Sequence, residues 1–383
     1  MATRRAITSV AAAVAVVAAG ASAPASASYF ASGDNKTNID FISSGAAVID
    51  CALGGGYAGG RVVNIVGDRS AGKTLLAMEA ATNFVLKHKK KFPKIKARYD
   101  ESEAAFDQEY AAALGTPIES IIFNEPGKPT ETVEDMHANL EAYIELCEKD
   151  GTPGLYIIDS LDALSDEAEM GREIGDASYG GTKPKKIGEM FRRLVRRMEQ
   201  AGVSMIVVSQ IRDKLNVTFG ETKTRSGGRA LDFYCTHIIW IVEIGKIKRT
   251  IRGEERVIGI EVELNVKKNK VGPAFRKARY TVMFGYGIDD MMASADWLCS
   301  VGREKRLAEL GMKKGASARA KTKVEAVSKV KEDTTLRDYK VVLADLRNGG
   351  GQAARDMRAA LTKIVKEEWS VIETELLPKA TKY

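Results

Sequence analysis

The stretch GDRSAGKT at residues 67–74 constrains the fold of this chain more than any other feature. It matches the pattern G-x-x-x-x-G-K-[ST], in which backbone N–H groups and a helix N-terminus surround nucleotide phosphates. The pattern requires a strand before it and a helix after it. Residues 62–66 have the β-branched composition of a buried strand, and residues 73–87 are typical of a helix. The chain is therefore predicted to contain a nucleotide-binding α/β domain.

Short β-branched runs alternate with longer amphipathic segments on both sides of this loop. Strands are predicted at residues 62–66, 96–99, 155–158, 205–208 and 237–242, and helices at 73–87, 131–148 and 186–201. Two later runs, 257–267 and 278–284, alternate in residue type around a Gly/Pro turn and are predicted to pair antiparallel. This alternation favours an α/β fold with a mostly parallel, twisted and buried sheet flanked by helices.

Composition limits the kinds of site and partner that we expect. The 4 cysteines form no C-x-x-C pair and the 3 histidines no helical ligand pair, which argues against a zinc or disulfide scaffold. The formal net charge of +7 favours a polyanionic partner, although a solvated basic surface explains the same value. With 383 residues, the chain has room for one large core and small attachments.

The N-terminal segment MATRRAITSVAAAVAVVAAGASAPASAS allows three interpretations. Its Arg pair, apolar run and A-S-A sequence are typical of a targeting peptide. The alternatives are a helix that docks on a neighbouring subunit and a disordered arm. The run is too short and too rich in small residues for a membrane span, so no membrane partner is expected. We predict an arm over residues 1–36, a core over 37–290 and a basic C-terminal domain over 291–383. Within the last, residues 303–331 are predicted to be a Lys/Ala-rich basic connection and residues 356–377 a helix.

The nucleotide site needs a metal ligand and a group that orients water. In the loop, nucleotide contacts are predicted for Gly67, Asp68, Arg69, Ser70, Ala71, Gly72, Lys73 and Thr74. Asp159 ends a buried apolar run and is predicted to hold Mg²⁺ with Thr74; the alternative is that Asp159 caps the next helix. The acids Asp100, Glu101 and Glu103 follow a neighbouring strand, whose end meets the same sheet edge, so all three are expected near the γ-phosphate of ATP.

Over residues 40–289 the chain resembles the RecA-type recombinases, the strand-exchange ATPases of bacteria and phages. The resemblance is carried by ISSG at 42–45, LGGG at 53–56, GRVV at 60–63 and EAAFD at 103–107. It implies a RecA-like P-loop ATPase core in which Glu103 is the catalytic base, with Asp107 and Tyr110 flanking the adenine. The family's D-x-E motif is replaced by E-S-E here, so Glu101 stays open as an alternative base.

Later segments resemble the family's DNA-binding loops and its intersubunit finger. EIGDASYG at 173–180 is similar to the first loop, and RSGGRAL at 225–231 to the second. The resemblance implies that Gln210 senses the γ-phosphate and that Lys268 and Lys270 of KKNK reach the neighbouring subunit's nucleotide. The implied DNA contacts are Arg172, Gly175, Ser178, Tyr179, Gly180, Arg212, Phe219, Arg225, Ser226, Gly227, Gly228 and Arg229.

The resemblance implies a DNA-dependent ATPase that hydrolyses ATP with Mg²⁺. Such a protein would polymerise head to tail on single-stranded DNA as a helical filament and catalyse homologous pairing and strand exchange. Duplex DNA, single-strand-binding proteins and mediator proteins are the other expected partners. The expected location is the cytoplasm, or an organellar matrix if the N-terminal segment is a transit peptide. Two alternatives stay open: a RecA-fold hexameric helicase and a non-catalytic paralogue that loads other recombinases.

Overall fold

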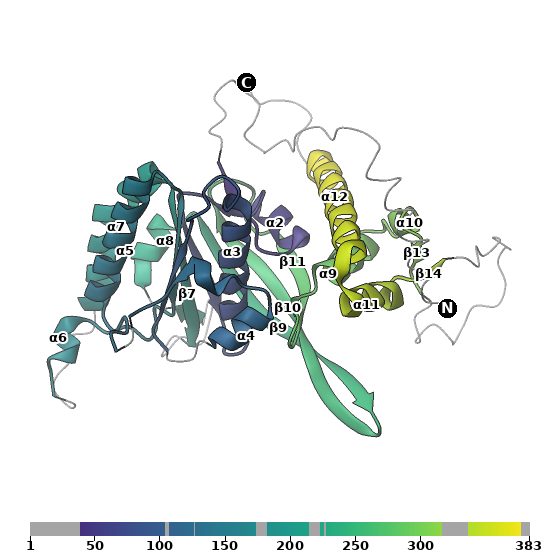
Figure 1. Cartoon of the computed structure of the whole chain (residues 1–383), viewed down its shortest axis with the longest axis horizontal. Helices are drawn as coiled ribbons and strands as arrows, with labels where there is room; N and C mark the ends of the chain where they lie inside the picture. The colour runs from purple at the N-terminus through teal and green to yellow at the C-terminus, as the bar shows by residue number, and fades with distance from the viewer. Residues whose placement is uncertain are drawn as a thin grey trace. The chain divides into compact units, whose positions relative to one another are not determined.

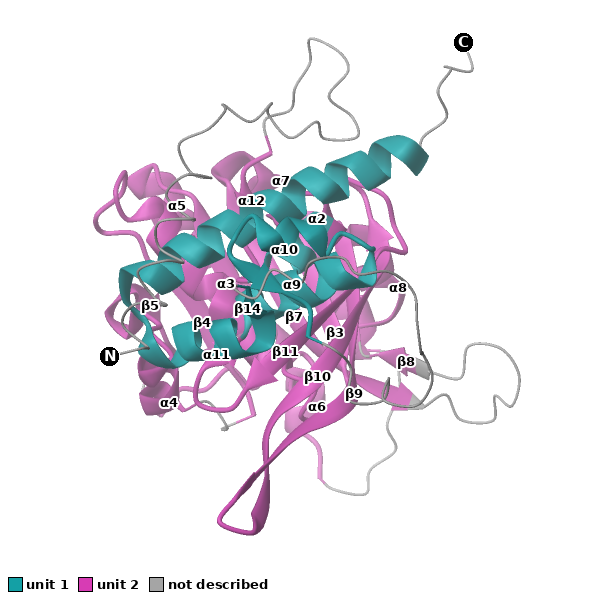
Figure 2. Ribbon diagram, turned by 90° about the vertical axis from the view of Figure 1, so that its right-hand side faces the viewer, with its two compact units in different colours: residues 1–27, 46–51, 289–383 teal, residues 28–45, 52–288 magenta. Residues whose placement is uncertain are grey.

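A computed structural model describes residues 39–103, 107–125, 127–173, 182–213, 223–225, 227–315 and 336–376. These residues form two compact units (Figure 2). The larger unit contains the described residues of 28–45 and 52–288, and the smaller contains 46–51 and the described residues from 289 onward. None of the helices in these described ranges is long and apolar enough to cross a membrane.

A 10-stranded sheet organises the larger unit, in the order β12-β11-β10-β9-β3-β7-β6-β4-β5, with β8 paired to β7. The strands from β9 to β5 are parallel, and β10, β11 and β12 continue the sheet antiparallel. This arrangement confirms the predicted α/β fold class. The strand bounds are β3 Val62–Gly67, β4 Ala97–Glu101, β5 Ile121–Ile122, β6 Gly154–Asp159, β7 Val203–Asp213, β8 Lys223–Arg225, β9 His237–Ile251, β10 Glu254–Asn269, β11 Lys277–Met283 and β12 Gly287–Ile288. Two short strands, β1 Phe41–Ile42 and β2 Tyr57–Ala58, pair outside this sheet.

Helices cover both faces of the sheet, as Figure 1 shows. On one face α5 (Val133–Asp150) and α7 (Thr182–Ala201) bury their apolar sides in a continuous core with alternate residues of β3, β6 and β7. On the other face α3 (Lys73–His88) contacts the same central strands. Both faces of the parallel strands are therefore buried, which explains their uninterrupted apolar composition. The remaining helices of this unit are α4 Gln108–Ala113, η1 Ile118–Ser120, α6 Glu167–Met170 and α8 Gly228–Tyr234.

Helix α5 shows how local sequence sets an element's limits. Thr132 precedes the helix, and its hydroxyl accepts a hydrogen bond from the backbone N–H of Asp135. In return, the Asp135 carboxylate accepts a hydrogen bond from the backbone N–H of Thr132. This capping box satisfies donors that the first helical turn leaves unpaired. Gly151 ends the helix with a left-handed φ of 62°. Left-handed backbone is least costly at glycine, so the helix stops there.

Strands β9 and β10 are longer than the sequence predicts. The expected strands cover 237–242 and 257–267, whereas β9 runs to Ile251 and β10 begins at Glu254. The added residues form a hairpin that turns at Arg252 and Gly253, both with positive φ. Figure 1 shows this hairpin extending away from the other strands of its unit. The prediction missed it because most of the added residues are exposed and many are polar, so they lack the apolar pattern of a half-buried strand.

The smaller unit is mainly helical. Its elements are α9 Asp290–Ser300, α10 Lys305–Ala308, β13 Met312–Lys313, β14 Arg337–Asp338, α11 Tyr339–Gly349 and α12 Gly351–Leu376, together with the start of α2, Ala47–Leu53. Trp297 of α9 stacks on Trp369 of α12 with ring centroids 5.2 Å apart. The helix expected at residues 356–377 is part of α12, whereas α9 and α11 were not predicted. Much of the predicted basic connection, 303–331, lies outside the described residues.

Candidate active site

The loop between β3 and α3 has the geometry of a phosphate cradle. Ser70 and Gly72 take positive φ values of 61° and 89°. A Cβ at Gly67 would lie 2.7 Å from the Ile241 side chain, so only glycine fits there. Gly72 leaves the N-terminus of α3 without a side-chain cap. Uncapped N–H groups and the positive end of a helix attract anions, so the loop suits phosphate.

Lys73 is the first residue of α3, directly after this loop. Its ammonium group donates a 2.7 Å hydrogen bond to the Asp68 carbonyl oxygen, which closes the loop on itself. Burial lowers the pKa of Lys73, and the nearby carboxylates of Asp159 and Glu103 oppose that shift. The lysine thus lies near two carboxylates at the edge of the sheet, while its ammonium group binds a backbone carbonyl. A phosphate is a stronger partner for such a charge than a backbone carbonyl.

Asp159 and Thr74 approach one another from two elements. Asp159 is the last residue of β6, and its Oδ2 accepts a 2.7 Å hydrogen bond from the Tyr99 hydroxyl. Burial raises the pKa of Asp159, and hydrogen bonds from Tyr99 and from Thr74, in the first turn of α3, lower it. A hydroxyl and a carboxylate together are the hard oxygen ligands that Mg²⁺ prefers. These residues therefore fit the predicted ion.

Glu103 joins the end of β4 to the end of β7. Its Oε1 accepts a 2.8 Å hydrogen bond from the Gln210 side-chain amide and another from the Ser160 hydroxyl. The Glu101 carboxylate instead accepts the backbone N–H of Glu103 at 2.8 Å. Glu101 thus holds the turn in which Glu103 lies. This geometry favours Glu103 over Glu101 as the water-orienting acid, an assignment that stays a prediction.

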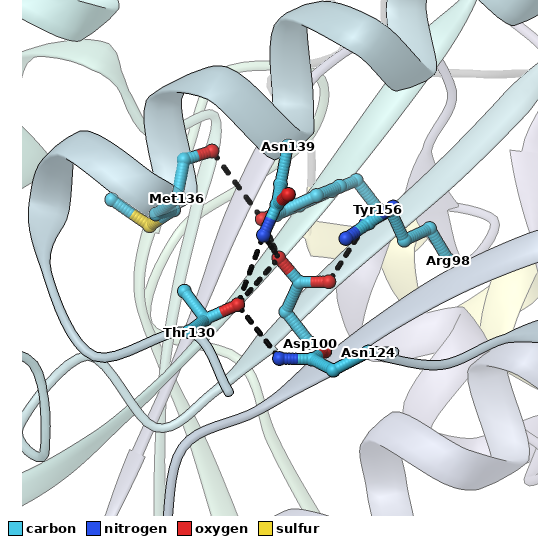
Figure 3. Close-up of polar contacts among 7 residues, drawn as sticks. All are labelled: Arg98, Asp100, Asn124, Thr130, Met136, Asn139 and Tyr156. Carbon is cyan, nitrogen blue, oxygen red and sulfur yellow. Dashed lines mark hydrogen bonds and ion pairs between the residues drawn. The ribbon is translucent and has the colours of Figure 1, made fainter. Parts of the chain in front are cut away.

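Asp100 does not belong to this site, so the prediction that all three acids lie near the phosphates is wrong for Asp100. It is fully buried and accepts hydrogen bonds from Arg98 at 2.7 Å, from Asn139 at 3.0 Å and from the Tyr156 hydroxyl (Figure 3). The reason is the alternation of side chains along a strand. Asp100 pairs in register with Ile158, which faces the α5 side of the sheet, whereas Glu101 pairs with Asp159.

Asp162 is a site residue that the sequence analysis missed. Its Oδ2 accepts the backbone N–H of Gln210 at 2.6 Å, and its Oδ1 accepts the Arg212 side chain at 3.1 Å. The side chain is only 5% exposed. Asp162 therefore anchors the part of β7 that carries Gln210 and leads into the predicted second DNA loop. Its position in the loop after β6 could have identified it from the sequence, because polar residues that follow adjacent parallel strands lie at the same edge of the sheet.

Lys268 and Lys270 both point at the end of α8. Lys270 donates a 2.9 Å hydrogen bond to the Phe233 carbonyl oxygen, and Lys268 donates to the Asp232 carbonyl. The carbonyl end of a helix carries partial negative charge, which favours cations there. Burial and the neighbouring Lys270 lower the pKa of Lys268. The two lysines are thus held side by side, and their action on another subunit stays a prediction.

The predicted adenine contacts lie at the start of α4. Asp107 caps this helix, because its carboxylate accepts the backbone N–H of Tyr110 at 2.9 Å. The Tyr110 side chain is 41% exposed and so accessible for stacking. The adenine roles of both residues stay predictions.

The predicted DNA contacts other than Gly227 and Gly228 divide into three groups. Two arginines are exposed to solvent: Arg212, whose side chain is 59% exposed, and Arg229. Arg172 donates a 3.0 Å hydrogen bond to the Ala168 carbonyl oxygen. Arg225 differs from the expectation of an open charge: its side chain is 7% exposed and pairs with Asp232 at 2.6 Å, a pair it would have to leave to bind DNA. The remaining predicted contacts outside the described residues are Gly175, Ser178, Tyr179, Gly180, Phe219 and Ser226.

Gly227 and Gly228 open α8 with positive φ values of 89° and 55°. At Gly227 a Cβ would lie 2.5 Å from the Leu231 side chain, so the observed need for glycine there is the close packing of this helix. A backbone approach of DNA at these glycines stays a prediction.

The phosphate cradle lies at the carboxyl edge of a mostly parallel sheet, and neighbouring strand ends there carry Asp159, Glu103 and Gln210. This arrangement defines a P-loop nucleotide-binding protein with a RecA-like core. Residues 25–289 match the RecA N-terminal domain family. The chain therefore belongs to the RecA family, and the resemblance predicted from the sequence is confirmed.

Curated relatives named Protein RecA agree with this assignment. The protein from Colwellia psychrerythraea is 33% identical over 261 residues, which cover 68% of this chain and 70% of the relative. That from Prochlorococcus marinus is 33% identical over 257 residues, 67% of this chain and 63% of the relative. A Synechococcus relative is 32% identical, with 67% of this chain and 62% of the relative covered. The chain thus matches less than two thirds of the length of the last two.

Proposed function

We propose that this RecA-type recombination protein is a DNA-dependent ATPase that assembles as a helical filament on single-stranded DNA and catalyses homologous pairing and strand exchange. The observation that carries the proposal is the 2.8 Å hydrogen bond from Gln210 to Glu103. Gln210 lies on β7, which leads into the predicted second DNA loop, and Glu103 is the candidate base. This hydrogen bond would couple the state of the nucleotide site to the predicted second DNA loop, which is the coupling that such an ATPase needs.

The residues divide the chemistry among them. Bound ATP with Mg²⁺ supplies the phosphoanhydride bond that is hydrolysed. Lys73 would leave the Asp68 carbonyl to bind the phosphates, while Thr74 and Asp159 would hold the ion. Glu103 orients the attacking water and accepts its proton, and Gln210 keeps the Glu103 carboxylate in place.

The proposed assembly is a head-to-tail stack of identical subunits, which gives an open helix. Its other proposed partners are duplex DNA, single-strand-binding proteins and mediators, and its proposed location is the cytoplasm. Residues 291–383 are proposed as an auxiliary duplex-DNA surface. Deleting residues 304–383 should then weaken duplex capture, and unchanged capture would count against that surface.

The test is ATP hydrolysis by the purified chain with and without single-stranded DNA, with electron microscopy of the same samples. DNA-stimulated turnover with helical filaments is the expected result. DNA-independent turnover with closed rings would replace the proposal with the hexameric helicase. Absence of turnover in both conditions would replace it with the non-catalytic loader.

Lys268→Ala combined with Lys270→Ala should preserve ATP binding but lower DNA-stimulated hydrolysis by about 10³-fold, the lower end of the range for cationic fingers. The reason is that the paired ammonium groups are proposed to stabilise charge on the neighbouring subunit's phosphates. Nucleotide binding and steady-state turnover measure the two effects. Lys267→Ala is the matched control, since Lys267 lies 5.5 Å over the Trp240 ring and outside this pair. Wild-type turnover in the double variant would refute the finger role.

A further inference from the structure

The outer part of the β9–β10 hairpin is supported by no other strand of the described chain. β9 pairs with β3 only as far as Ile241, and β10 pairs with β11 only from Gly259 onward. Residues 242–247 pair with β10 residues 259–263, which also pair with β11, so only residues 248–257 pair solely with one another. Figures 1 and 2 show the hairpin projecting from its unit in both views. An isolated two-stranded ribbon has no core of its own and is at best marginally stable in water.

This ribbon carries a strong positive charge. Residues 246–256, KIKRTIRGEER, contain 5 basic and 2 acidic side chains. Apolar side chains are exposed among them: Ile251 is 55% and Val257 39% exposed. An exposed surface that combines arginine, lysine and isoleucine side chains can bind a polyanion that has apolar surface between its charges.

The register places two arginines directly opposite each other. Arg249 pairs with Arg256, so both guanidinium groups lie on one face of the ribbon. Like charges directly opposite each other destabilise a sheet. Arg256 approaches Glu254 at 3.3 Å, but both side chains are at least 70% exposed, where such pairs contribute little. Within the described residues Arg249 has neither a hydrogen bond nor an ion pair.

The opposite face is different. Lys248 donates a 2.8 Å hydrogen bond to the Glu255 carboxylate, so those two charges compensate each other. Within residues 248–257, the face of Arg249 and Arg256 also carries Glu254 and keeps one net positive charge, whereas Lys248 and Glu255 leave the opposite face neutral. Ile247 and Ile251 flank the arginines, because they alternate onto the same side. The ribbon is thus asymmetric, with one face suited to contacts with phosphates.

We propose that this ribbon is a duplex-DNA-binding element whose Arg249 and Arg256 contact the phosphate backbone. A two-stranded β-ribbon fits the major groove of B-DNA, which is about 12 Å wide. Duplex is favoured over single-stranded DNA because residues 242–258 contain no aromatic side chain, and single-strand sites depend on base stacking. The element is separate from the DNA loops predicted above. It deepens the proposed function and rests on it for its biological role.

The test is a salt titration of duplex binding by the full chain. Arg249→Gln with Arg256→Gln removes two phosphate contacts at nearly constant side-chain length. The slope of log K against log salt should become shallower by about 1.8, and affinity at 0.1 M salt should fall roughly 60-fold. The probe is a fluorescent blunt-ended duplex of mixed sequence, read by anisotropy. Lys248→Gln with Glu255→Gln is the control: it alters the other face without changing net charge and should bind like wild type. A wild-type slope in the arginine variant would overturn the proposal.

A second variant tests the ribbon as a whole. Replacing residues 247–259 with Asn-Gly joins Lys246 to Ile260, which already face each other, by a two-residue hairpin turn. The base of the sheet is kept, so DNA-stimulated ATPase should persist while duplex affinity falls at least as far as in the arginine variant. Loss of the ATPase with an unchanged salt slope would instead identify the ribbon as a contact between copies. If the wild type shows no DNA-stimulated ATPase, the proposed function fails, yet the slope still decides the ribbon.

Discussion

Glu103→Gln is expected to lower DNA-stimulated ATP hydrolysis by about 10²- to 10⁴-fold, the usual contribution of a general base, while ATP binding persists. A glutamine keeps the oxygen that accepts hydrogen bonds from Gln210 and Ser160. The turn should therefore stay in place, and only the capacity to accept a proton is lost. Single-turnover hydrolysis and equilibrium nucleotide binding separate these effects. We further propose that hydrolysis releases the interface between subunits, so filaments of this variant on DNA should persist.

Glu101→Gln is the matched control for this assignment. The Glu101 side chain accepts the backbone N–H of Glu103, a bond that a glutamine oxygen can also accept. Turnover near that of wild type is therefore expected. Normal hydrolysis in Glu103→Gln together with strong loss in Glu101→Gln would exchange the two roles. Lys73→Ala should differ from both variants by losing nucleotide binding itself, since Lys73 is the cationic group of the cradle.

The parts of the site that the sequence predicted share one property: each is local, or follows from where parallel strands end. The phosphate loop is set by glycines within a few residues of Lys73. Asp159, Glu103 and Gln210 follow separate buried strands, and parallel pairing alone brings them together. The error at Asp100 came from treating adjacent acids as equivalent. Successive side chains of a strand point to opposite faces of the sheet, so Asp100 and Glu101 cannot lie on the same face.

The features that sequence reasoning missed depend on pairings between distant residues. The role of Asp162 arises from its contact with Gln210, 48 residues away. The burial of the Arg225 side chain accompanies an ion pair between its guanidinium group and Asp232. The hairpin beyond Val242 has no apolar alternation to reveal it, because its residues face solvent on both sides. Such features are set by tertiary contacts, which periodicity does not record.

Asp100→Ala is expected to destabilise the larger unit by about 3–5 kcal/mol, the usual cost of removing one partner of a buried ion pair. The Asp100 carboxylate is 0% exposed and the Arg98 side chain only 17%. Without the carboxylate, the guanidinium loses its 2.7 Å partner, and the buried Tyr156 hydroxyl loses an acceptor. Guanidinium chloride unfolding, followed by circular dichroism, measures the change.

Two further variants make this expectation specific to the buried cluster. Glu125→Ala removes an ion pair with Lys128 whose side chains are 73% and 77% exposed, so the free energy of unfolding should change little. Asp100→Leu with Arg98→Met replaces both buried charges by apolar groups and should recover much of the lost stability. Because Asp100 faces away from the phosphate loop, the folded Asp100→Ala protein should bind ATP normally. Equal destabilisation by Asp100→Ala and Glu125→Ala would show that burial does not set the strength of this pair.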